Sequence, residues 1–98
     1  MKTFEDITWE IHKTFGEEGG FQGKLMLDNG MEISVICGGK MAYSTRGYLN
    51  GPEDAATFEM CVFDKMGNVD HDSNMGWLDR DEINEIIKSI TLNGAGKW

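Results

Sequence analysis

The sequence has few basic side chains, and this shortage limits the kinds of partner it can bind. Of its 98 residues, 9 are Lys or Arg and 17 are Asp or Glu, which gives a net charge of -8 at pH 7. Affinity for phosphate depends on clustered Lys and Arg, so direct binding to nucleic acid is disfavoured, and so is an anionic membrane. Acidic surfaces are attracted to basic protein surfaces, although charge also serves solubility alone.

Cysteine, proline and long apolar runs are also scarce. The chain has one proline and two cysteines, Cys37 and Cys61, and no stretch approaches the roughly 20 apolar residues of a membrane span. Its first residues lack the apolar core of a secretory signal, so we expect a cytoplasmic protein with both thiols reduced and buried. A chain of this length has room for one core, so we expect a single domain over 1–98, with 93–98 frayed.

Two segments have the apolar spacing of helices. Thr3 and Asp6 resemble a capping box and predict a helix over residues 4–15, with Trp9 beside the apolar stripe, either flanking the core or forming a contact surface. Asp79 and Glu82 form a second acidic box that predicts a helix over 80–91. The apolar stripes of the two helices are Phe4, Ile7, Ile11 and Phe15, and Ile83, Ile86, Ile87 and Ile90.

Between these helices the pattern is that of strands. Asn29-Gly30 is a hairpin turn signal, flanked by an alternating segment from residue 24 and a return strand over 31–37. Residues 41–48 could add a short strand, and 57–63 has the two partly apolar faces of a central strand. We therefore expect an α+β fold, in which an antiparallel sheet of three to four strands carries an N-terminal and a C-terminal helix on one face.

The segment 70–82 resembles a calcium-binding EF-hand loop with one extra residue. Such a loop needs oxygen ligands at alternate positions, a glycine at the bend and a closing Glu. Met75 lengthens the loop by one residue, and the preceding element reads as a strand and turn instead of a helix. The competing interpretation is an exposed polar loop before a capped helix. The weak calcium site would consist of Asp70, Asp72, Asn74 and Glu82.

Catalytic patterns are sparse. His12 and His71 have no cysteine or second histidine at metal-binding spacing, Ser44 lies in no known motif, and Cys37 has no base near it in sequence. We therefore expect no enzymatic activity and no cofactor.

The remaining feature is a concentration of acidic residues from Asp64 to Glu85. This segment has seven acidic and two basic residues, a net charge of -5. Met75 and Trp77, which we expect to be exposed, lie within it, and mixed acidic and aromatic surfaces often bind proteins. A solvated face is the simpler alternative. The candidate partner-binding residues are Asp70, Asp72, Met75, Trp77, Asp79, Asp81, Glu82 and Glu85.

The order of motifs resembles that of a broad group of small uncharacterised phage and prophage proteins. The likeness covers residues 30–90 and consists of a strand at 33–37, Tyr43-Ser44, a strand at 58–63 and Gly76-Trp77-Leu78 leading into the closing helix. Small acidic phage proteins of this kind include anti-CRISPR and anti-restriction inhibitors of host defence. The resemblance implies a phage setting in the host cytosol and brings no catalytic residues with it.

Three functional hypotheses follow. The first is a non-catalytic, anti-CRISPR-like inhibitor that binds a basic surface of a host defence or nucleic-acid-handling protein. The second is a small calcium-binding module built on the 70–82 loop. The third is a homo-oligomeric accessory protein whose apolar strand faces pair between chains.

Overall fold

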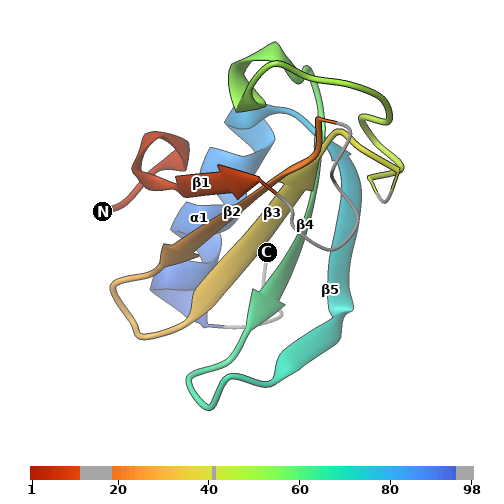
Figure 1. The fold of residues 1–98 in the computed structure, drawn as a ribbon. Coiled ribbons are helices and arrows are strands. Elements are labelled where there is room, and N and C mark those ends of the chain that lie inside the picture. The colour runs from red at the N-terminus through yellow and green to blue at the C-terminus, as the bar shows by residue number, and fades with distance from the viewer. Residues whose placement is uncertain (12–18, 41, 95–98) are drawn as a thin grey trace.

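The structure is a computed structural model that describes residues 1–11, 19–40 and 42–94, without the side chains of 70–73. Five strands form one antiparallel sheet in the order β1-β2-β3-β4-β5, and a single helix follows (Figure 1). No helix in these ranges is long and apolar enough to cross a membrane. The elements are β1 (Thr8–Ile11), β2 (Phe21–Met26), β3 (Glu32–Cys37), β4 (Phe58–Phe63), β5 (Val69–Leu78) and α1 (Arg80–Asn93).

The core lies between α1 and one face of the sheet, and α1 runs behind the sheet in Figure 1. Alternate residues of β3 and β4 point to this face, and the four isoleucines of α1 meet them, each at most 7% exposed. The predicted sheet over residues 24–63 and the predicted C-terminal helix are therefore confirmed. The other face, which we call the open face, is formed in β3 and β4 by Ser34, Ile36, Glu59, Cys61 and Phe63.

Polar contacts hold α1 near both of its ends, and the sequence predicted the one at its N-terminus. The Asp79 carboxylate accepts the Glu82 amide at 2.8 Å, and the Glu82 carboxylate accepts the Asp79 amide at 3.1 Å. At the other end, the side-chain amide of Asn29 in the β2–β3 turn donates to the Ile90 carbonyl at 3.0 Å. The hairpin turn thus holds the helix against the sheet.

The predicted helix over residues 4–15 is wrong. The acidic box closes only one 3-10 turn, Phe4–Asp6, after which Thr8–Ile11 pairs with β2. Gly23 lies opposite Trp9, and a Cβ at Gly23 would come within 2.8 Å of the Trp9 ring, so the missing side chain makes room for the indole. Trp9 packs on Phe4 and Phe58, with ring centroids 5.9 Å apart in each case, and therefore flanks the core. Residues 12–15 of the prediction lie outside the described residues.

Two further predictions between the helices are wrong. Of the predicted strand over 41–48, residue 41 lies outside the described residues, and 42–48 form no strand, with only an isolated bridge between Gly39 and Gly47. The segment 70–76 is not a loop, because it belongs to β5. As an edge strand, β5 needs only one neighbour, so polar residues can occupy it. The sheet consequently has five strands instead of three or four.

Candidate functional site

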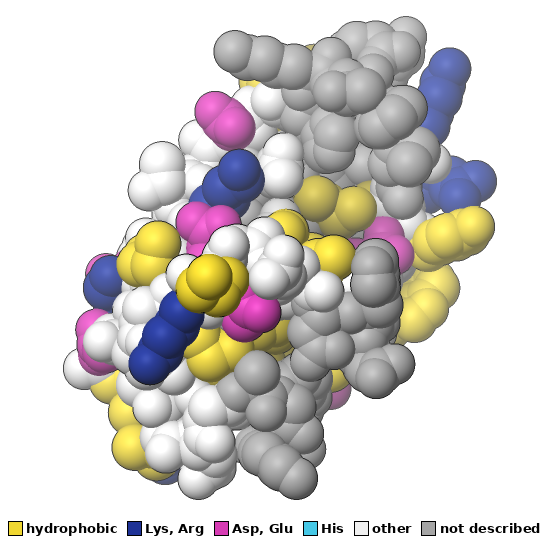
Figure 2. Space-filling view, turned by 90° about the horizontal axis from the view of Figure 1, so that it is seen from below, with side chains coloured by type: hydrophobic (Ala, Val, Ile, Leu, Met, Phe, Trp, Pro, Cys, Tyr) yellow, Lys and Arg dark blue, Asp and Glu magenta, His cyan; other side chains and the backbone are white. Residues whose placement is uncertain are grey.

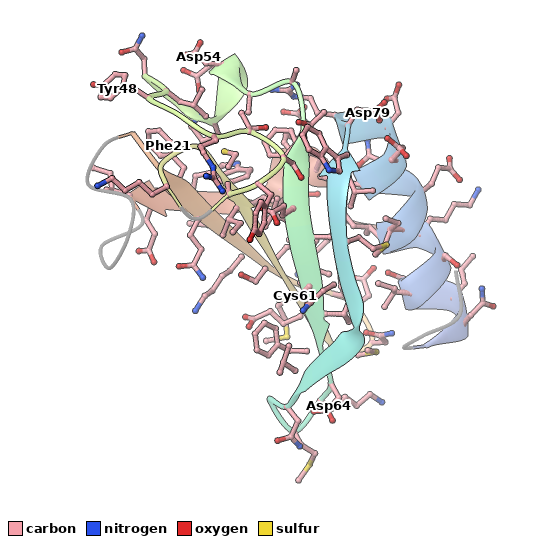
Figure 3. All side chains as sticks on the ribbon, turned by 90° about the vertical axis from the view of Figure 1, so that its right-hand side faces the viewer. Phe21, Tyr48, Asp54, Cys61, Asp64 and Asp79 are labelled. Atoms are coloured by element: carbon pink, nitrogen blue, oxygen red, sulfur yellow. The ribbon has the colours of Figure 1, made fainter. Side chains whose placement is uncertain are left out.

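A groove separates β5 from the first turns of α1, and Figure 3 shows Asp79 at the junction of the two elements. Its volume is about 440 Å³. The floor is apolar and the rim carries four carboxylates. The lining residues of this β5–α1 groove are Met75, Leu78, Asp79, Asp81, Glu82, Glu85 and Ile86.

The carboxylates gather here because they belong to the start of a helix. Acidic side chains are stabilised near a helix N-terminus, where they complement its dipole and bind unpaired amides. Asp79 and Glu82 serve the capping box described above. Asp81 and Glu85 are four residues apart on the same helix surface, and both are exposed. These two carboxylates face solvent at the rim.

The neighbouring cation does not neutralise the groove. The Arg80 guanidinium turns toward the loop before β4, where it donates to the carbonyls of Pro52 and Glu53 at 3.3 and 3.2 Å. It also stacks over the rings of Phe4 and Phe58. No Lys or Arg is among the described residues that line the groove. Figure 2 shows the molecule from below. On this side, by contrast, basic and acidic side chains are interspersed.

Trp77, the residue before Leu78 of the groove, has an unusual backbone conformation. Its φ angle is 61°, and no other non-glycine in the described residues has a positive φ. The strand register shifts here, since Leu78 pairs with Phe58 but Met75 with Met60, which places one extra residue in β5. A bulky residue in the left-handed region costs about 1–2 kcal/mol. Despite this cost, Trp77 is 67% exposed to solvent.

Ser44 holds this strained backbone in place. The buried Ser44 hydroxyl accepts the Trp77 amide at 2.5 Å, and the Ser44 carbonyl accepts the Thr57 hydroxyl at 2.7 Å. One residue earlier, the Tyr43 amide donates to the Glu59 carboxylate at 2.5 Å. The loop around Ser44 is therefore bound to both β4 and β5.

We predict that Ser44→Ala destabilises the protein by about 1–3 kcal/mol, because it leaves the Trp77 amide without its acceptor. Ser34→Ala is the matched control. Ser34 is equally buried, but within the described part of the chain its hydroxyl accepts only from the Gln22 side chain, which can bond to water instead. Chemical denaturation should give a larger loss for Ser44→Ala than for Ser34→Ala. Equal losses would contradict the role assigned to Ser44.

The structure brings together most, but not all, of the predicted partner-binding residues. Five of them line the groove, and Trp77 is the residue before Leu78 of the groove. Met75 is half-buried against the core instead of exposed. Asp70 pairs with Val62, toward the opposite end of β5 from Leu78, and the side chains of Asp70 and Asp72 lie outside the description.

The backbone of the predicted calcium loop differs from that of an EF-hand loop. An EF-hand loop must wrap around its ion, whereas residues 69–78 are extended and paired to β4. Several strand residues, each rising roughly 3.3 Å, separate Asp70 from Glu82, whose carboxylate caps α1. The described residues contain no group of His, Cys, Asp and Glu placed to hold a metal ion.

We therefore expect calcium at about 1 mM, the weak end of calcium affinities, to leave tryptophan fluorescence unchanged. Magnesium at the same ionic strength is the control for screening. A saturable change with calcium alone, lost in Asp70→Ala, would contradict the extended conformation of this segment.

Both thiols are free and poorly suited to nucleophilic chemistry. Burial raises the pKa of Cys37 to about 12, and it also raises the pKa of the half-buried Cys61. Because the thiolate is the reactive form, both cysteines should react slowly near neutral pH.

Sequence reasoning missed the contributions of Ser44 and Glu59. Both act through contacts that are distant in sequence, from Ser44 to Trp77 and from Glu59 to Tyr43. The only local sign of these contacts in the sequence was Gly76, because a Cβ at this position would come within 2.8 Å of the Ser44 hydroxyl.

A scan against protein-family models and searches of curated proteins and of solved structures find no match to this chain.

Proposed function

We propose that the chain is a non-catalytic protein that binds a basic surface of a host protein through the β5–α1 groove and Trp77. The observation that carries the proposal is the strained, exposed Trp77, two residues before the rim carboxylate Asp79. Backbone strain persists where the surroundings enforce it, and it concentrates at functional sites. Glycine would adopt this φ without strain, so folding alone gives no reason for a tryptophan here.

The groove has the chemistry of a site for Lys or Arg. Their methylene stems bury well on apolar surfaces such as Met75, Leu78 and Ile86, while the charged heads can reach the rim carboxylates. An exposed tryptophan can also stack on a guanidinium. The net charge of -8 would speed the encounter with a basic partner.

We further propose that the partner is a host defence or nucleic-acid-handling protein, which the chain inhibits by covering its nucleic-acid-binding surface. The resemblance to small phage proteins supports this setting, in which the chain acts in the host cytosol. The charge supports it as well, because a surface that holds nucleic acid is basic.

The test is capture of partners from a bacterial lysate, identified by mass spectrometry, with two groove variants beside the parent chain. Trp77→Gly removes the indole, and Asp81→Lys with Glu85→Lys reverses the charge at two of the four rim positions without touching the capping pair. The control is Glu10→Lys with Asp28→Lys, which makes the same charge change at two exposed positions outside the groove.

The proposal expects one basic protein to be retained by the parent and by the control, lost by both groove variants, and released by added DNA or RNA. Retention by all four proteins would contradict the site. Retention that nucleic acid does not affect would contradict the inhibitory mechanism.

A further inference from the structure

A second hollow lies on the open face, on the other side of β5 from the groove. Its volume is about 330 Å³, and Met75 lines both hollows. In Figure 3 the sheet is seen edge-on, with Cys61 on the side away from α1. The side chains that give this open-face pocket its chemistry are Ser34, Ile36, Glu59, Cys61, Asn74 and Met75.

The residues that line this pocket favour a ligand with a positively charged group at the end of an aliphatic chain. Glu59 is the one charged residue among the described residues that line the pocket, and one of its carboxylate oxygens accepts the Tyr43 amide. Among the described residues, Tyr43 is the one donor to this carboxylate, which leaves its other oxygen for a donor of the partner. Ile36, Cys61 and Met75 offer apolar surface for methylene groups. The volume is at the lower limit of the roughly 300–1,000 Å³ of small-molecule sites, which suits a single side chain.

We propose that the open-face pocket is a second subsite for the basic partner, which takes one Lys or Arg side chain while the β5–α1 groove takes the neighbouring one. The inference rests on the function proposed above. It narrows the partner to an extended segment with two adjacent basic residues that lies along the outer edge of β5.

The geometry of an extended chain explains why the two basic residues are adjacent. Successive side chains of an extended segment point to opposite sides, so residues i and i+1 can enter hollows on opposite faces of one strand. β5 is the last strand of the sheet, and no described strand covers its outer side. Its bulges interrupt a regular hydrogen-bonding edge, so side chains would supply most of the recognition.

The test uses Cys61 as a reporter of pocket occupancy. A blocked peptide with two adjacent arginines between valine and threonine residues is compared with a peptide whose arginines are two positions apart. Maleimide labelling of Cys61 is followed by mass spectrometry, and peptide binding by the fluorescence change on titration. At ten times its Kd, the adjacent-arginine peptide should slow labelling about tenfold, because only unoccupied protein reacts. The spaced peptide should bind but leave the labelling rate unchanged.

A variant adds an independent readout. Glu59→Gln keeps an oxygen for the Tyr43 amide but removes the charge, so the adjacent-arginine peptide should bind about two- to fivefold more weakly, while the spaced peptide is unaffected. If both peptides bind and neither protects Cys61, the second subsite is wrong and the proposed function stands. If neither peptide binds, the proposed function fails as well. Protection that depends on protein concentration alone would mean that a second copy of the chain occupies the pocket, which also overturns the inference.

Discussion

Truncating Ile87 to alanine should lower the free energy of unfolding by about 2–5 kcal/mol. Ile87 is fully buried in the middle of α1, within the core between the helix and the sheet. Removing its side chain loses apolar burial and leaves a cavity beside rigid strands. A loss of this size is a large share of the roughly 5–15 kcal/mol by which such domains are stable.

Urea denaturation followed by circular dichroism measures this loss, and Leu92→Ala is the matched control. Leu92 lies on the same helix but is 65% exposed, so its truncation should change stability by less than about 0.5 kcal/mol. If Ile87→Ala unfolds at the same urea concentration as the parent, α1 does not dock on the sheet, and the groove that α1 helps to form does not exist.

Replacing Trp77 with glycine should weaken partner binding by about 2 kcal/mol or more, the usual effect of losing an aromatic anchor. The free energy of unfolding should stay within about 1 kcal/mol of the parent, because relief of the strain at φ 61° offsets the added freedom of glycine in the unfolded chain. Surface plasmon resonance with the captured partner measures the first effect, and denaturation the second.

Trp9→Ala is the contrasting variant, since the indole of Trp9 packs on Phe4 and Phe58. It should lower stability, because its half-buried ring packs against the core. A Trp77→Gly protein that binds normally but unfolds easily would assign Trp77 a structural role and would remove the main support for the proposed site.

The sequence predicted an element correctly where the local signals of a segment agreed with its packing in the fold. For α1, the capping pair Asp79 and Glu82 and the isoleucine stripe all agreed with packing on a sheet. The N-terminal segment was assigned to a helix because Phe4, Ile7 and Ile11 recur at helical spacing, although Ile7, Trp9 and Ile11 also fit the alternation of a strand. Pairing with β2 opposite Gly23 decided in favour of a strand, and sequence spacing cannot reveal that pairing.

The same limit applies to the site. The acidic residues at the start of α1 and the exposure of Trp77 followed from local pattern. The polar segment 70–76 was assigned to a loop because its composition is that of a loop, and its pairing to β4 is a long-range effect. Ser44 and Glu59 could not be identified, since their partners lie 33 and 16 residues away.

The most direct test of the central claim is an NMR titration of the labelled protein with a blocked peptide that contains one arginine. The amide and indole signals report each residue separately, and the titration detects even weak binding. The account predicts that the largest shifts cluster at Trp77, Leu78 and the helix positions Asp81 to Glu85, and that Trp77→Gly reduces them. Shifts spread evenly over exposed carboxylates such as Glu10 and Asp28, or confined to the hairpin turns, would contradict a binding site at the β5–α1 groove.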